Sequence, residues 1–252
     1  MDNITIETCC GSYEDVIASK AAGVHRAELN SALFLGGLTP SLGNFLLARQ
    51  LGGIEILPMI RPRPAGFFYS DAEYQTMICD AELFVKHGAD GIVFGFLHAD
   101  GTVDAERTSN FVRIAAEAGR AAVFHRAFDL TPDPFAALET LIQCGVTRIL
   151  TSGQAPSVPE GLEMLKALVE RAKERIEILP GAGIRPTNVA HIISYTNVTQ
   201  VHFSAMAQRH EPSAQHNPAI TFGGALRPRE DLFDVISTEK IGKMTEAIDI
   251  MG

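Results

Sequence analysis

Short apolar runs alternate with longer amphipathic segments along most of this 252-residue chain. Runs rich in branched and aromatic side chains indicate buried strands, and the amphipathic segments between them indicate helices. The expected strands cover residues 4–9, 24–29, 54–60, 91–97, 121–124, 148–151, 176–179 and 200–203. The expected helices cover residues 12–22, 41–51, 71–87, 104–118, 135–144, 159–173 and 186–195.

Local start and stop signals mark the same boundaries. Ser12 is a helix N-cap, and Asp133 followed by Pro134 supplies an N-cap and a first-turn proline for another helix. Glycines stand where a left-handed residue closes a helix, at positions 23, 88, 119 and 145. Strands that alternate with helices in this way are parallel and are joined by right-handed crossovers.

Polar residues end nearly every expected strand, and this favours one of two architectures. In an open doubly wound sheet the ligand binds at a single switch point, whereas a (β/α)8 barrel builds its site from many strand ends. The polar strand ends here are Glu7, Cys9, Glu28, Asn30, Arg61, Arg63, His125, Arg126, Asp129, Thr151, Ser152, Gly181, Gly183, His202 and Ser204. We therefore predict an α/β fold, a (β/α)8 TIM barrel in which residues 1–252 form a single domain.

The segment Val123–Pro134 passes from an apolar strand through ionisable side chains into a helix start. Buried charge is costly unless it is paired, so His125, Arg126 and Asp129 do little for stability at this junction. Perturbed ionisable groups gather at functional sites, which makes this junction a candidate active site. The alternative is a structural cluster of ion pairs at the barrel rim.

Side chains alternate along a strand, so spacing predicts which of them face inward. Glu7 and Cys9 share one face, and Cys10 takes the other. The same rule pairs Glu28 with Asn30, Arg61 with Arg63, and His125 with Asp129. Crowded charges can raise the pKa of one carboxylate towards neutrality, which suits a general acid or base. We predict four catalytic residues, Glu7, Glu28, His125 and Asp129, and a static lattice of salt bridges is the alternative.

The turn Gly181-Ala182-Gly183 follows the seventh expected strand, and Ser204 follows the eighth. Many barrels hold a phosphate at these loops, where backbone amides and a helix N-terminus attract anions. A simple tight turn is the alternative. We predict the following substrate-binding residues: Arg26, Arg61, Arg63, Arg126, Thr151, Ser152, Gly181, Gly183, His202 and Ser204.

Composition narrows the class of partner. A net charge of −9 provides no basic patch for a nucleic acid, so we expect the partner to be a small molecule, and an anionic one. The four cysteines form no disulfide framework and show no CxxC spacing of the kind found in zinc sites. No apolar run approaches the length of a membrane span and no signal peptide is apparent, so we expect a cytoplasmic protein without a membrane partner.

Several blocks together resemble the signature of the CutC family. They are Glu7-Thr8-Cys9-Cys10, Arg26-Ala27-Glu28-Leu29, Gly36-Gly37-Leu38-Thr39-Pro40-Ser41, Met59-Ile60-Arg61-Pro62-Arg63, Phe67-Phe68-Tyr69-Ser70-Asp71, Phe124-His125-Arg126-Ala127-Phe128-Asp129 and Leu150-Thr151-Ser152-Gly153-Gln154. The blocks run in order along the chain. The resemblance implies the same barrel, a homodimer and a role in copper homeostasis.

One position departs from the family pattern. Asn30 stands where the family commonly has a cysteine, which leaves Cys9 as the main ligand for copper(I). Copper(I) prefers thiolate and thioether ligands, so we expect weak binding or none, unless Met59, His125 or Cys10 assists. Two hypotheses stay open: a lyase, isomerase or hydrolase that uses carboxylate and histidine acid–base catalysis, and a copper(I)-binding protein.

The segment 207–237 shows no clear periodicity, and we expect an irregular loop or arm there. It could serve as a lid or a dimer arm, or be disordered. Its histidines, His210 and His216, are expected to be solvated rather than bound to metal. A terminal helix is predicted over 238–250.

Overall fold

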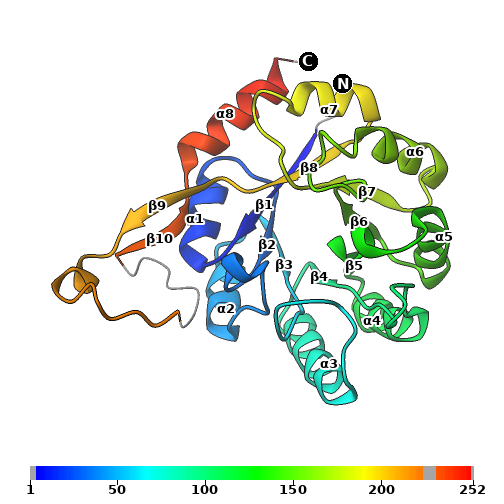
Figure 1. Ribbon diagram of the computed structural model, residues 1–252, viewed down its shortest axis with the longest axis horizontal. Coiled ribbons are helices and arrows are strands. Elements are labelled where there is room, and N and C mark those ends of the chain that lie inside the picture. Colours follow the sequence, from blue (N-terminus) through cyan, green and yellow to red (C-terminus); the bar gives the residue numbers. More distant parts are fainter. Residues whose placement is uncertain (1–3, 224–230, 251–252) are drawn as a thin grey trace.

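Eight parallel strands form a ring in the computed structural model, which describes residues 4–223 and 231–250 (Figure 1). Hydrogen bonding joins them into two sheets, ordered β3-β2-β1-β8 and β4-β5-β6-β7. Parallel bridges Met59 to Val93 and Gly181 to His202 connect the sheets on both sides. The predicted TIM barrel is confirmed. Its strands are β1 Thr5–Cys10, β2 Arg26–Leu29, β3 Glu55–Pro58, β4 Gly91–Phe94, β5 Ala121–Phe124, β6 Arg148–Thr151, β7 Glu177–Pro180 and β8 Gln200–Phe203.

The helices form a layer around the ring (Figure 1). They are α1 Tyr13–Ala21, α2 Leu42–Gln50, α3 Asp71–Lys86, α4 Ala105–Glu117, α5 Pro134–Cys144, α6 Leu162–Ala172, α7 Val189–Thr196 and α8 Thr238–Asp249. Caps explain several boundaries: Ser70 and Glu73 form a capping box at α3, and Gly145 closes α5 at φ +81°. No helix in the described part of the chain is long and apolar enough to cross a membrane.

Alternation along each strand divides the apolar residues into two cores. The larger core lies between strands and helices and includes Phe45, Phe94 and Phe124. The smaller core lies inside the ring and consists of Leu57, Met59, Val93 and Val123, with Ala121 packed against it. Both cores fix the strand ends that carry the candidate site.

The C-terminal segment corrects one prediction. Instead of a wholly irregular loop over 207–237, β9 Met206–His210 pairs antiparallel with β10 Leu232–Ile236. Arg209 fixes this hairpin, because its guanidinium lies 4.7 Å from the Phe233 ring centroid and pairs with Glu14 of α1. The hairpin projects beside α1, away from the centre of the barrel (Figure 1). A short 3-10 turn, η3 Pro212–His216, follows β9, and residues 224–230 of the predicted loop lie outside the described part.

Candidate active site

A cavity of about 440 Å³ opens at the carboxyl ends of the barrel strands, and we call it the mouth cavity. Strands β1, β2 and β8 and the segments after β3, β5 and β7 contribute to its wall. The predicted site residues that line it are Cys9, Glu28, Arg61, His125, Arg126, Gly181, Gly183, His202 and Ser204. The wall also contains Leu33, Phe67 and Arg185, which were not predicted as site residues, and Met59, which was named only as a possible helper in copper(I) binding.

Glu7 and Arg26 face the barrel interior but lie outside the cavity lining, beside His202. The Arg26 guanidinium pairs with Glu7 and donates to the Gln200 side chain at 2.7 Å. Nδ1 of His202 lies 2.7 Å from the other Glu7 oxygen. Burial alone would raise the pKa of Glu7, but the hydrogen bond to His202 and the charge of Arg26 outweigh it and lower the pKa to about 2. Glu7 is therefore a fixed carboxylate.

This fixed carboxylate determines the tautomer of His202. A carboxylate can only accept a hydrogen bond, so Nδ1 of His202 carries the proton that Glu7 accepts. The other ring nitrogen, Nε2, is left for the cavity. Burial would lower the pKa of His202, but the charges of Glu28 and Glu7 outweigh it and raise the pKa.

Glu28 is the buried carboxylate of the mouth cavity, with only 3% of its surface exposed. Oε2 accepts from the Asn30 amide at 2.8 Å and from the Cys9 thiol at 3.6 Å. Oε1 has no hydrogen-bond partner among the described residues. Burial raises the pKa of Glu28, and the charge of His202 only partly opposes this.

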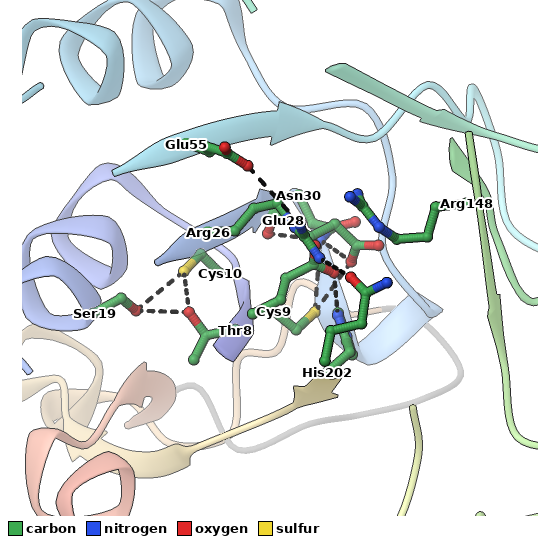
Figure 2. Close-up of polar contacts among 12 residues, drawn as sticks. Thr8, Cys9, Cys10, Ser19, Arg26, Glu28, Asn30, Glu55, Arg148 and His202 are labelled. Carbon is green, nitrogen blue, oxygen red and sulfur yellow. Dashed lines mark hydrogen bonds and ion pairs between the residues drawn. The ribbon is translucent and has the colours of Figure 1, made fainter. Parts of the chain in front are cut away.

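Cys9 and Cys10 lie on opposite faces of β1, as alternation requires. Figure 2 shows Cys9 beside Glu28, Asn30 and His202, whereas Cys10 contacts Thr8 and Ser19 on the helix side. Burial and the neighbouring charge of Glu28 raise the pKa of the Cys9 thiol well above its ordinary value. Cys9 is therefore a protonated thiol that faces the cavity.

His125 and Arg61 supply hydrogen-bond donors from the segments after β5 and β3. Nδ1 of His125 accepts from the Ala127 amide at 3.1 Å, so Nε2 carries the proton, and this buried atom has no partner among the described residues. Burial and the charge of Arg61 lower the pKa of His125 to about 3. Arg61 packs 5.1 Å from the Phe67 ring centroid, and its buried Nε likewise has no partner in the described structure. The cavity therefore contains one unpaired acceptor, Glu28 Oε1, and two unpaired donors.

Asp129, Thr151 and Ser152 form a separate hydrogen-bonded group outside the cavity lining. The Asp129 carboxylate accepts from the Thr151 hydroxyl, from the Ser152 amide at 3.1 Å and from Arg126 Nε at 2.7 Å. Its capacity is used by these donors, so it holds Arg126 at the rim of the cavity and offers little to a ligand.

Arg63 turns away from the cavity. It pairs with Glu73 at the start of α3 at 2.5 Å and donates to backbone carbonyls of the loop before that helix. Its guanidinium lies 4.9 Å from the Tyr69 ring centroid. Arg63 therefore organises the loop after β3.

Known proteins of one family are similar to this chain in sequence and in structure. The sequence pattern of the CutC family matches residues 4–207. The chain is 52% identical to family protein CutC of Treponema denticola, over 98% of this chain and all of that protein. It is 39% identical to the human copper homeostasis protein cutC homolog, over 94% of this chain and 86% of that protein.

A crystal structure of CutC from Streptococcus agalactiae superposes with a TM-score of 0.75 at 35% identity, covering 79% of this chain and 98% of that chain. This chain belongs to the CutC family.

The names of these relatives mention copper, so we asked whether residues at the mouth cavity could bind a copper ion. Cys9, Glu28 and His202 each offer one ligand atom, and these atoms all lie within 4.8 Å of one another. The set consists of one sulfur, one oxygen and one nitrogen. Copper(I) favours sulfur ligands and also accepts imidazole, so the Glu28 oxygen is the ligand of the three that suits it least. Sequence reasoning assigned these residues to three different roles, because nothing local links positions 9, 28 and 202.

Proposed function

We propose that this CutC family member is an enzyme that carries out acid–base chemistry on a small anionic or polyhydroxylated molecule in the mouth cavity. One observation carries the proposal: the buried Glu28 carboxylate has a free oxygen at a cavity that also contains two unpaired donors. Buried polar atoms are almost always paired, so each exception calls for an explanation, and a bound ligand is one such explanation.

The cavity residues suggest a division of roles. Glu28 is the proton acceptor or donor, since a raised pKa brings its protonated form closer to neutral pH. His125 stays neutral at pH 7 because its pKa is about 3, so Nε2–H can donate a hydrogen bond to a substrate oxygen. Arg61 Nε is the second donor, and the guanidinium charge favours negative charge on the substrate.

The rim of the cavity favours an anionic group. Arg126 and Arg185 both line it, and Asp129 fixes the first of them. The turn after β7, just before Arg185, holds Ala182 at φ +97° and Gly183 at φ +74°. This combination of cations and a tight backbone turn suits a carboxylate or phosphate on the substrate. A lyase, isomerase or hydrolase reaction is compatible with these roles.

Proton exchange tests the proposal before the substrate is known. We expect that the protein, incubated in D2O with a panel of small sugar phosphates, hydroxy acids and keto acids, removes or exchanges a C–H proton of one compound, as followed by ¹H NMR. Glu28→Gln should slow that exchange at least about 100-fold. Glu117→Gln, an exposed carboxylate of α4, is the matched control and should exchange at the wild-type rate. Equal rates for Glu28→Gln and wild type, or no change in any compound, would contradict the proposal.

A second candidate function is copper(I) binding with Cys9 as the main ligand. The names of the relatives favour it, and Cys9 supplies one sulfur ligand within the cluster of Cys9, Glu28 and His202. Competition against a strong copper(I) chelator tests this candidate. One ion retained per chain, and lost in Cys9→Ser, would support copper(I) binding over the acid–base proposal.

A further inference from the structure

Three strands that are neighbours in the ring bring the Cys9, Glu28 and His202 side chains together. β8, β1 and β2 are adjacent, and Cys9 and Glu28 are register partners on β1 and β2. The ligand atoms of the three residues lie within 4.8 Å of one another (Figure 2). Side chains on paired strands are held more precisely than side chains on loops, which is what a metal site needs.

Buried partners orient two of these three ligands. Glu7 accepts the Nδ1 proton of His202 at 2.7 Å, which directs Nε2 to the cluster. Asn30 donates to Glu28 Oε2 at 2.8 Å and fixes the carboxylate. A carboxylate that holds the far nitrogen of a ligating histidine is the usual outer shell of protein metal sites. Glu28 Oε1, buried and without a partner in the described chain, provides an independent sign that a ligand is missing.

The chemistry of the three ligand atoms selects the ion. One sulfur, one carboxylate oxygen and one imidazole nitrogen match a borderline divalent ion of the zinc class, which accepts all three ligand types. Three protein ligands and an open position are also the pattern of catalytic zinc sites, and all three residues line the mouth cavity, from which a fourth ligand would come.

We infer that Cys9, Glu28 and His202 form a site for a divalent metal ion of the zinc class, preferred over copper(I), with an open coordination position towards the mouth cavity. Binding forms one bond each from the metal to sulfur, oxygen and nitrogen, and the protons held by the Cys9 thiol, by His202 Nε2 or by Glu28 are released to solvent. The inference does not depend on the proposed activity, since it is measured as binding alone.

Cobalt(II) is the probe for the site, because it replaces zinc and reports on its ligands. We expect the full-length protein to bind one Co²⁺ per chain with tetrahedral visible bands and a near-ultraviolet sulfur-to-cobalt band. Zn²⁺ should displace the cobalt stoichiometrically. Cys9→Ser should remove the sulfur band and weaken Zn²⁺ binding by more than the 10- to 100-fold that loss of an outer-shell partner costs.

Two further variants separate this site from other outcomes. His210→Ala/His216→Ala removes exposed histidines of the hairpin region and should leave both the spectrum and the Zn²⁺ affinity unchanged. Asn30→Cys places a second sulfur near Cys9, whose Sγ lies 3.5 Å from the Asn30 amide nitrogen, and should increase copper(I) retention against a chelator. Absence of Co²⁺ and Zn²⁺ binding would overturn the inference. Binding that survives Cys9→Ser, or wild-type protein that retains copper(I) but not Zn²⁺, would also overturn it.

Discussion

The barrel interior has two unlike halves. The polar half comes from β1, β2, β6 and β8 and contains Glu7, Cys9, Arg26, Glu28, Arg148, Gln200 and His202. The apolar half comes from β3, β4 and β5 and contains Leu57, Met59, Val93 and Val123. Both halves occupy the same kind of position in the same ring, so the difference does not follow from the fold.

Stability accounts for the apolar half, because apolar contact inside the ring is favourable without any partner. The polar half buries ionic groups whose desolvation opposes folding, and replacing such groups by apolar ones is often neutral or stabilising. Its residues are largely paired, but Glu28 Oε1 and Arg148 Nη1 have no partner among the described residues. Stability alone therefore does not explain the polar half, three of whose residues, Cys9, Glu28 and His202, line the mouth cavity.

Breaking the main ion pair of the polar half should give the largest effect on stability. Arg26→Met leaves the Glu7 carboxylate buried beside His202 without its cation. We expect unfolding free energy to fall by about 3–5 kcal/mol and the melting temperature by about 10 °C. Urea and thermal unfolding measure this.

Arg113→Met is the matched control for that measurement. Arg113 pairs with Glu117 on the surface of α4, and its side chain is 63% exposed. Its loss should cost at most about 1 kcal/mol. If both substitutions cost the same, the buried ion pairs of the polar half do not hold the fold.

A hydroxyl placed in the apolar half should cost somewhat less. Val93→Thr keeps the side-chain shape but buries a polar group among Leu57, Met59 and Val123, where no partner is expected. We predict a loss of about 1–3 kcal/mol in unfolding free energy. The same change at Val112, a half-buried residue of α4, should be nearly neutral in urea unfolding. Equal stability of Val93→Thr and wild type would show that the apolar half tolerates polar groups, and the comparison would fail.

The sequence predicted the ring well because hydrophobic periodicity is a local property. The strands expected at 121–124, 148–151 and 200–203 have those bounds in the structure. The pairing of β9 with β10 was missed, because the two strands are separated by a long segment rich in proline and glycine and stabilise each other only after meeting. Two expected helices, 159–173 and 186–195, begin at prolines, but in the structure α6 begins at Leu162 and α7 at Val189.

The site was predicted only where side-chain alternation holds. It separated Cys9 from Cys10 because both lie within β1. Alternation does not apply at Asp129, because the chain leaves β5 after Phe124 and forms the 3-10 turn η2 Arg126–Leu130. It does not apply at Arg63 either, because this residue lies beyond the end of β3. Alternation also gives the face of a strand but not the depth along the barrel, so the position of Glu7 and its contact with His202 needed the stagger between strands.

Titration of His125 should change the unfolding free energy by less than breaking the Arg26–Glu7 ion pair does, and it tests a buried polar residue that lines the mouth cavity. The pKa of this histidine falls from its ordinary 6.5 to about 3 on folding. The unfolded chain therefore binds the proton more readily, so stability is fully present above pH 6.5 and is lost as pH falls towards 3. At pH 5.5 the titration of His125 lowers the unfolding free energy by about 1.4 kcal/mol.

The variant His125→Gln lacks this titration. We expect the melting temperature of wild-type protein to fall further than that of His125→Gln between pH 7.5 and pH 5.5, because the two proteins share all other titrating groups. His98, which is half exposed, gives a matched control through His98→Gln, whose melting temperature should follow that of wild type across this range. Parallel curves for His125→Gln and wild type would mean that the buried imidazole accepts its proton without cost.

The smallest expected effect on stability, and the largest on activity, belongs to Glu28→Gln. Folding raises the pKa of Glu28, so ionisation is harder in the folded than in the unfolded chain. The folded state is therefore penalised once pH exceeds the unfolded pKa, and the penalty grows until pH passes the folded pKa. Glutamine keeps the shape and removes the charge, so the variant should melt at the same or a higher temperature than wild type at pH 7, and the difference should shrink towards pH 4.

A static salt-bridge network predicts the opposite, since loss of one partner of a buried pair destabilises by about 3–5 kcal/mol. Thermal melts of Glu28→Gln and wild type across this range decide between the two: a strongly destabilised variant at pH 7 would assign Glu28 to the structure of the barrel, whereas a stable but inactive one would assign it to chemistry.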